Sequence, residues 1–517
     1  MKSKILKTAF VLVAATVVGI MTLTPRALFA SEVDVKVYGW VRNNLGMFTD
    51  KIDFSGSGND LATCRTWVRA YIETTMSDQL SSWVALQAAH EPTYHMEKGS
   101  VSSNVHYTGE PTARSGKEYS EYRDINDVLR ECFIRWQPSV NHTFKLGRQI
   151  VIWGEAMTQR VGDVIHPDDG RYALGFANLE DSRIPMWMLR GTHYFEDLHG
   201  MELDWLVSPN LARKEFTVGR GGNFATVAHI PPPFGAGFTI LNTGQRLGLR
   251  PDDRQYGVES KYPTAGNGAY GIPASIETEY PDNSLDDLRY GFRVSTYMGK
   301  TMLYLSYFHT QNYNPASEVT RLNPFAYNLK LVYPDEDIFG VSLNSEMPKG
   351  LVRAEAIWVP NRTFAVWDPN DADKIDKRDY IKYMAAYDVT FFFQWNKSAP
   401  LNLTLEHVGE WYPDNDYILY FGGIESERQY SYTPTISLSA RMSFMNRWDA
   451  MQIVSYLPKD KSGLTISQVS YKPIWMNNAW QFTLQYIRVF SEDYYHGMGP
   501  LEQKDQVVFT TQYNFYL

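Results

Sequence analysis

The sequence predicts an all-β protein, a transmembrane antiparallel β-barrel of about 18 strands, with 16 to 20 strands as the range. Three observations lead to this fold. Apolar and polar residues alternate in runs near the length of a tilted membrane strand, short and long connections alternate, and the chain ends in an aromatic-rich amphipathic strand. The 517 residues also include 14 Trp, 34 Tyr and 26 Phe, which a barrel places in two interfacial girdles.

Alternation with period two is clearest in the stretch 288–295, and it recurs at 388–395 and 437–444. A soluble β-sandwich would alternate too, but its strands are about 5–6 residues long. The longer runs favour a membrane wall. Within 288–295 the apolar face would hold Leu288, Tyr290, Phe292 and Val294, and the polar face Arg289, Gly291, Arg293 and Ser295.

The connections divide into tight turns and long polar loops. Connections that are short on one side of a barrel and long on the other are typical of periplasmic turns and extracellular loops. One short connection, at 459–463, falls on the long side. We expect tight turns at 77–79, 196–200, 298–300, 347–350, 396–400 and 446–447, and long loops at 50–61, 92–126, 151–184, 208–285, 312–336, 361–378, 413–428 and 492–504.

The two ends of the chain indicate export to an outer membrane. Lys2, Lys4 and Lys7 precede an apolar run at 10–23, which predicts a signal peptide over 1–30 and a mature barrel over 31–517. An uncleaved anchor is the alternative, although the run is short for a spanning helix. The strand at 506–517 is similar to the assembly signal of outer-membrane proteins. We therefore expect the outer membrane of a Gram-negative bacterium, with its lipid and the barrel-assembly machinery as partners.

Charge and cysteine content exclude some classes of protein. The net charge of -9 argues against nucleic acid as a partner. Cys64 and Cys132 are the only cysteines, so a disulfide framework is not what stabilises the fold. These two thiols either pair, if their strands lie close, or remain small buried or lipid-facing groups.

The loop at 151–184 carries too many charges to face lipid, so it must lie outside the membrane or inside the barrel. We interpret it as a plug or gate. Because charges in a lumen must be paired or solvated, we expect salt bridges around an inserted loop, the alternative being a wide hydrated pore. The expected lumen and plug residues are Arg65, Arg69, Glu73, Glu131, Arg135, Arg148, Glu155, Asp163, Asp168, Arg183, Arg289, Arg293, Arg353, Glu355 and Arg441.

The loop at 208–285 is long for a structureless connection and is expected to be functional. Its middle, 219–241, is apolar, rich in Gly and interrupted by Pro. Phe224, Phe234 and Phe238 are the expected apolar gate: they either pack into the barrel mouth or contact an apolar solute.

Catalytic and metal-binding motifs are not evident in the sequence. It contains no phosphate-binding loop, no His-Glu-x-x-His and no G-x-S-x-G elbow. Asp168 and Asp169 offer oxygen ligands for calcium, but Pro167–Gly170 also reads as a plain turn. We expect no cofactor, no metal site and no enzyme activity.

Four short motifs resemble a known family. Gly147-Arg-Gln149, Trp153-Gly-Glu155, Asp163–Asp168 and Leu179–Pro185 are similar to a proteobacterial outer-membrane β-barrel family catalogued as a domain of unknown function (DUF1302). The resemblance is strongest over 133–194 and extends more weakly to the C-terminus. The family usually has Asn where this chain has His166. It implies an outer-membrane barrel encoded beside an RND-type lipid exporter and a periplasmic carrier-like protein.

The leading functional hypothesis is a channel or export conduit for a hydrophobic or amphiphilic, lipid-like solute, gated by inserted loops. A general diffusion porin, an outer-membrane enzyme and a structural surface protein are the alternatives. Conductance measurements separate a gated conduit from a general diffusion porin. Catalytic turnover would identify an enzyme, and loss of adhesion in a knockout would identify a surface protein.

Overall fold

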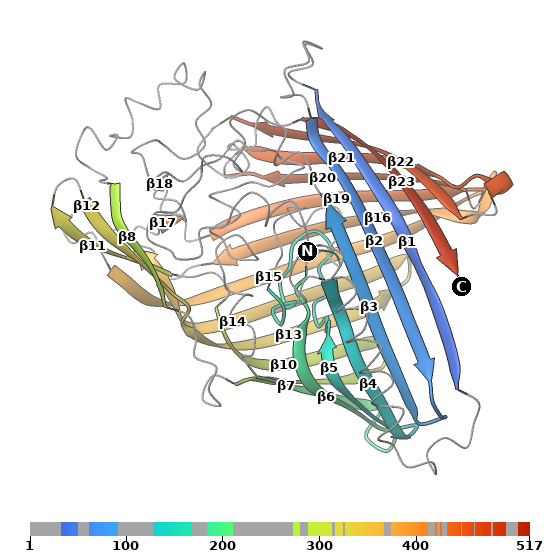
Figure 1. Cartoon of the computed structure of the whole chain (residues 1–517), viewed down its shortest axis with the longest axis horizontal. Coiled ribbons are helices and arrows are strands. Elements are labelled where there is room, and N and C mark those ends of the chain that lie inside the picture. The colour runs from blue at the N-terminus through green and yellow to red at the C-terminus, as the bar shows by residue number, and fades with distance from the viewer. Residues whose placement is uncertain are drawn as a thin grey trace, which may run out of the picture.

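The strands of the chain form one large closed sheet (Figure 1). The structure is a computed structural model. It describes residues 33–49, 61–90, 128–167, 181, 183–209, 272–279, 288–312, 316–323, 326–366, 374–411, 419–420, 424–425, 432–445, 447–459, 461–476, 479–492 and 505–516.

Eighteen antiparallel strands make up this sheet, each paired with the next along the chain. The predicted fold class is confirmed, including the strand number. In order around the barrel the strands are β1 (Asp34–Phe48), β2 (Leu61–Thr75), β3 (Leu80–His90), β4 (Leu129–Ser139), β5 (His142–Gln149), β6 (Met186–Phe195), β7 (Met201–Ser208), β9 (Arg289–Met298), β10 (Thr301–Gln311), β13 (Asp335–Met347), β14 (Gly350–Val366), β15 (Lys374–Phe393), β16 (Asn396–Trp411), β19 (Tyr432–Phe444), β20 (Trp448–Leu457), β21 (Ser462–Tyr471), β22 (Trp480–Ser491) and β23 (Gln506–Tyr516).

The barrel closes where the last strand meets the first. β23 pairs with β1 in a continuous antiparallel register from Tyr38–Tyr516 to Phe48–Gln506. The amphipathic segment at the C-terminus therefore serves as the closing strand. Because closure leaves no sheet edge exposed, every strand can satisfy its backbone hydrogen bonds inside a bilayer.

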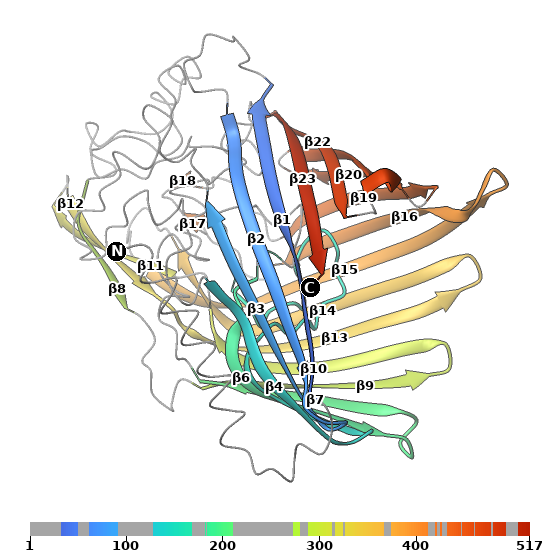
Figure 2. The same ribbon diagram turned by 45° about the vertical axis from the view of Figure 1, so that its right-hand side comes forward.

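The connections sort by length onto the two ends of the barrel, as Figure 2 shows for the hairpins that join β9 to β10, β13 to β14 and β15 to β16. We call these the short-turn end and the long-loop end. Gly200 and Gly299 take positive φ values of 68° and 67° at two short turns, a conformation that glycine adopts without strain. The short β20–β21 connection at the long-loop end matches the exception noted in the sequence.

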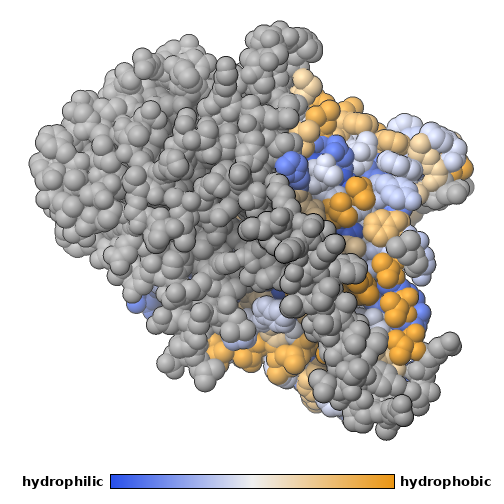
Figure 3. Space-filling model, viewed as in Figure 1, coloured by the Kyte–Doolittle hydropathy of each residue, from blue (hydrophilic) through white to orange (hydrophobic). Residues whose placement is uncertain are grey.

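The two faces of the wall differ as the alternation predicts. Tyr290 and Phe292 of β9 are about half exposed on the outside, whereas Arg289, on the other face, is 1% exposed. Figure 3 shows apolar residues on the visible outer surface of the strands, interspersed with paler ones. Such a surface would be covered by lipid. Among the described residues, no helix is long and apolar enough to span a membrane.

Two small sheets form in addition to the eighteen-stranded sheet, and sequence reasoning did not foresee them. One pairs β8 (Ile272–Glu279) in parallel with β12 (Ala326–Val332), which also pairs with β11 (Ala316–Asn323). The other joins β17 (Leu419–Tyr420) to β18 (Ile424–Glu425). The described part of the predicted plug loop 208–285 is thus a strand. No disulfide joins Cys64 to Cys132, so the option of a pairing between them is excluded.

Candidate functional site: the lumen and its inserted segment

The connection between β5 and β6 turns inward. Its described first part, Val151–Pro167, lies within the outline of the barrel in both ribbon views (Figures 1 and 2). We call Val151–Pro167 the inserted segment. Its partners lie on the inner face of one part of the wall, which we call the covered arc: β6, β7, β9, β10, β13–β16 and β19.

The tightest attachment is at Glu406 of β16. One carboxylate oxygen accepts a hydrogen bond from the backbone N–H of Met157 at 3.0 Å, and the other from the N–H of Thr158 at 3.0 Å. The Thr158 hydroxyl also donates to this carboxylate. Glu406 is fully buried. A buried carboxylate is costly unless hydrogen-bonded, so these donors and the carboxylate stabilise each other.

A second carboxylate, Glu355 of β14, holds the segment from the neighbouring part of the wall. The N–H of Glu155 donates to it at 3.3 Å, and the backbone of Gly162 donates as well. A Cβ at position 162 would collide with the Glu355 carboxylate, so only glycine allows this approach. Arg353, paired with Asp388 at 2.6 Å, donates to the Glu155 carbonyl.

The third attachment joins Trp153 to an ion cluster centred on Asp204 of β7. The indole N–H of Trp153 donates to Asp204 Oδ2 at 2.9 Å. Arg190 binds both oxygens of that carboxylate, at 2.8 and 2.7 Å. Arg293 donates to the Trp153 carbonyl at 3.4 Å and lies 3.9 Å from Asp204. Both the side chain and the backbone of Trp153 are therefore fixed to the wall.

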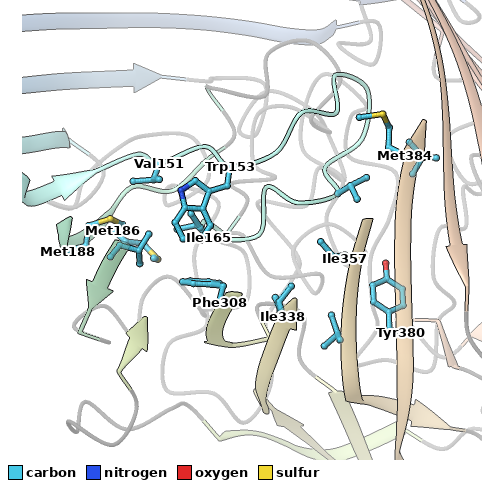
Figure 4. Close-up of a cluster of buried hydrophobic side chains, with 14 of the residues drawn as sticks. Val151, Trp153, Ile165, Met186, Met188, Phe308, Ile338, Ile357, Tyr380 and Met384 are labelled. Carbon is cyan, nitrogen blue, oxygen red and sulfur yellow. The ribbon is translucent and has the colours of Figure 1, made fainter. Parts of the chain in front are cut away.

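An apolar core joins the segment to the covered arc, and Figure 4 shows its side chains reaching toward one another from the segment and from the strands of the wall. Each side chain is less than a tenth exposed. This lumen is therefore packed as a hydrophobic core on one side, which the salt-bridge expectation did not include. The segment contributes Val151, Trp153, Val161 and Ile165, and the wall contributes Met186, Met188, Leu206, Phe308, Ile338, Ile357, Val359, Tyr380, Met384, Ala386 and Val408.

Inside the segment, Asp163 and His166 fix the fold of the chain. Asp163 pairs with Arg183 at 2.5 Å and Arg160 at 3.1 Å. His166 Nε2 accepts from the N–H of Val151 at 2.8 Å, and Nδ1 lies 3.0 Å from the Ile184 carbonyl, to which it must donate. Burial lowers the pKa of His166 to about 3, so the ring is neutral. Its two hydrogen bonds join Val151 at the start of the β5–β6 connection to Ile184 at its end.

Across the lumen, β20–β23 with β1–β3 form what we call the opposite arc, and β4 and β5 lie between the two arcs. Its distinctive feature is a cluster on β1 and β2, where Arg42 and Arg69 both bind Asp181 of the β5–β6 connection, at 3.2 and 2.7 Å. Burial alone would raise the pKa of Asp181, but Arg69 and Arg42 hold it below its usual range. Trp40 and Trp67 pack against each other and against the guanidinium groups.

Comparison with known proteins identifies the family. The model of the protein family of unknown function DUF1302 matches residues 84–515. The chain belongs to this family. The resemblance expected from the motifs at 147–149, 153–155, 163–168 and 179–185 is therefore confirmed. No curated protein shows significant similarity to the sequence.

Solved structures similar to this DUF1302 barrel are outer-membrane proteins. They include OccK8 (OprE) of Pseudomonas aeruginosa (TM-score 0.45, 9% identity, 94% of this chain and 98% of the other). OpdK of the same species, solved with vanillate, has a TM-score of 0.42 and 9% identity, with 94% of this chain and 99% of the other covered. Salmonella typhi OmpF, complexed with daunomycin, has a TM-score of 0.39 and 9% identity, with 93% of this chain and 97% of the other covered. At these scores the likeness supports no inference about function.

The expected lumen residues of this DUF1302 barrel separate into three groups. Those that meet at the inserted segment are Glu155, Asp163, Arg183, Arg293, Arg353 and Glu355. Those that are buried or half-buried elsewhere in the wall are Arg65, Arg69, Glu131, Arg148 and Arg289. Glu131 accepts a hydrogen bond from the N–H of Ile150 at 3.0 Å, Arg148 donates to the Arg130 carbonyl, and Arg289 donates to Gln311. Those near the short turns are Glu73, Arg135 and Arg441.

Some predicted and some unpredicted residues need separate mention. Asp168, Phe224, Phe234 and Phe238 lie outside the described residues. Asp204 and Arg42 were not among the expected site residues, although each sits on the polar face of an alternating strand. Among the described residues, no three His, Cys, Asp or Glu side chains converge as a metal site.

Proposed function

We propose that the protein is an outer-membrane channel or export conduit for an amphiphilic or hydrophobic solute, narrowed by the inserted segment. The observation that carries the proposal is the pair of carboxylates, Glu406 and Glu355, that bind backbone N–H groups of the segment from two wall strands. A wall built to hold a segment in the interior supports a restricted passage rather than an open diffusion pore.

The attachments support a fixed constriction more than a swinging gate. The segment is held at the two carboxylates, at Trp153 and by a shared apolar core. Hydrogen bonds to charged groups contribute roughly 1.5–3 kcal/mol each, and burial of large apolar side chains adds similar amounts. The passage that we propose therefore follows the opposite arc.

The opposite arc has the mixed chemistry that an amphiphile requires. On the inner faces of β21 and β22, Leu464, Ile466 and Ile487 lie toward the long-loop end. Gln468 and Gln485 follow toward the short-turn end and bond to each other at 3.4 Å. Apolar and uncharged polar groups along one path suit a solute with an apolar body and a polar head.

Single-channel conductance in planar bilayers tests the proposal. Glu406→Ala removes the acceptor of three hydrogen bonds and should release the segment, so conductance should rise severalfold and become noisy. Asn402→Ala is the matched control, because Asn402 shares the inner face of β16 and bonds to Thr390. Both should leave the barrel heat-modifiable on gels. A large, steady conductance that is the same in wild type and Glu406→Ala would instead identify a general diffusion porin.

A further inference from the structure

The Asp181 carboxylate is held between two arginines of the opposite arc. Its Oδ1 lies 2.7 Å from Arg69 Nη2 and its Oδ2 lies 3.2 Å from Arg42 Nη1, so each oxygen receives one guanidinium. The side chains of Asp181 and Arg69 are 6% and 4% exposed. Gln512 and Gln87 accept from the two arginines at 2.9 and 3.1 Å and fix their orientation.

Indole rings form the walls of this site. Arg42 stacks 4.2 Å above the Trp40 ring, and Arg69 lies 5.0 Å from the same ring. The Trp67 ring lies 5.9 and 5.8 Å from the two guanidinium carbons. Stacked guanidinium groups in a desolvated site are rigid and bind an anion more strongly than in water.

An aromatic row continues from this site toward the short-turn end. Tyr38 stacks on Tyr71 at 5.3 Å between ring centroids, and both rings contact Trp83, at 6.2 and 5.4 Å. By strand register these residues share the inner face with Trp40 and Arg69. An apolar body of one to two rings, or a short chain, could lie along this row beside the arginine pair.

The receptor groups come from the wall and the carboxylate comes from elsewhere. Arg42 and Asp181 are 139 residues apart, and the arginines are held in place by Gln512 and Gln87 independently of Asp181. Among the described residues, the buried Nε of Arg69 has no acceptor, so the internal carboxylate leaves one donor unused. Asp181 therefore occupies a carboxylate receptor without satisfying it.

We propose that the Arg42–Arg69 pair and the Trp40–Tyr38–Tyr71–Trp83 row form a binding site for an amphiphilic monocarboxylate, and that its carboxylate takes the place of Asp181. This rests on the proposed function, because the solute reaches the site through the lumen. The bridging geometry suits the two oxygens of a carboxylate. At the far end of the row Glu73 is the register partner of both Trp83 and Lys36, so the Arg42–Arg69 pair is the part of the site that recognises a single carboxylate.

Isothermal titration with phenylbutyrate, and with neutral phenylbutyramide, tests the site on the full-length barrel in nanodiscs, after subtraction of empty discs. A tethered competitor acts at roughly millimolar effective concentration or above. Asp181→Asn should therefore tighten phenylbutyrate binding at least about tenfold. Arg69→Gln should weaken it by a similar factor, since hydrogen bonds to charged groups are strong. Asp449→Asn, which also removes a wall carboxylate paired with an arginine, should change nothing.

Two results would overturn the site: equal phenylbutyrate affinity in wild type, Asp181→Asn and Asp449→Asn, or equal binding of phenylbutyramide. Heat-modifiability on gels reports folding of each variant. If Arg69→Gln does not fold, Arg69→Lys keeps the charge but loses the planar fork and should still weaken binding. Titration is independent of conductance, so a large, steady conductance that is the same in wild type and Glu406→Ala, together with intact carboxylate binding, refutes the proposed function alone. The converse result refutes only this inference.

Discussion

The covered arc and the opposite arc are built on the same strand alternation but line the lumen differently. On the covered arc, the inward charges are matched within the wall, as in Arg353–Asp388 and Lys382–Glu410, or by the inserted segment. On the opposite arc, the described inner faces of β21, β22 and β23 carry no Asp, Glu, Lys or Arg. On β1 and β2, by contrast, Lys36, Arg42, Arg65, Arg69 and Glu73 share the inner face, and Arg42 and Arg69 bind Asp181.

The difference between the two arcs shows how one barrel can attach an inserted segment firmly to one side of its lumen only. Buried carboxylates on the covered arc have backbone N–H donors that only an ordered segment supplies, so they select one position of that segment. Uncharged inner faces place no such demand. In the channel that we propose, a solute would pass these uncharged faces and meet the arginine pair on β1 and β2.

Loss of Trp153 should have the largest effect on the difference between the two arcs, because it should release the inserted segment from the covered arc. Trp153→Ala removes a buried indole and its bond to Asp204, and such changes cost about 3–5 kcal/mol. The segment should then leave the covered arc, and trypsin should cut after Arg160 roughly a hundredfold faster or more. Mass spectrometry of the fragments gives the rate.

Trp480→Ala is the matched control, because this tryptophan lies on the outside of the opposite arc. It should leave cleavage at Arg160 slow. Cleavage in wild type as fast as in Trp153→Ala would mean that the covered arc does not hold the segment.

Acid should loosen the segment by a smaller amount, through His166. The pKa of the docked ring is about 3, and that of a free His is about 6.5, so docking is fully stable above pH 6.5 and weakens as the pH falls toward 3. Between pH 7 and pH 5 the loss is about 2 kcal/mol. Asp163, Arg160 and Arg183 are the charged groups around the ring. Conductance should increase at pH 5.

The control for this effect is His166→Asn, whose amide offers one acceptor and N–H donors but does not titrate. Its conductance should stay constant between pH 7 and pH 5. An equal acid response in wild type and His166→Asn would assign the effect to another group.

The smallest effect is expected from a charge placed on the opposite arc. Gln485→Glu puts a carboxylate on the uncharged inner face of β22. Stability should change by less than about 0.5 kcal/mol, because the site does not touch the segment. Reversal-potential measurements should show a shift toward cation selectivity, with cleavage at Arg160 unchanged. Release of the segment by this variant would mean that the two arcs are coupled.

The wall could be read from the sequence because its determinants are local. Period-two alternation fixes which side chains face outward, turn residues fix the short end, and the aromatic strand at 506–516 closes the barrel. The charges in 151–184 also excluded a lipid-facing loop, and its described first part, Val151–Pro167, lies inside. These inferences need only neighbours along the chain.

The attachments of the segment could not be read because they are nonlocal. Glu406 meets Thr158 across 248 residues, and Trp153 meets Phe308 in a core that no single strand reveals. Asp204 and Arg42 looked like ordinary members of polar faces. The β8, β11 and β12 sheet was missed for the same reason, since its parallel pairing joins two different loops.

Hydrogen exchange of the wild-type barrel in nanodiscs tests most directly whether the segment is clamped in the lumen. The backbone N–H groups of Val151, Glu155, Met157 and Thr158 each donate to a wall or segment acceptor. Their peptides should exchange as slowly as those of the neighbouring strands β14 and β16. Exchange at the rate of a free loop would contradict the clamp and, with it, the constricted channel.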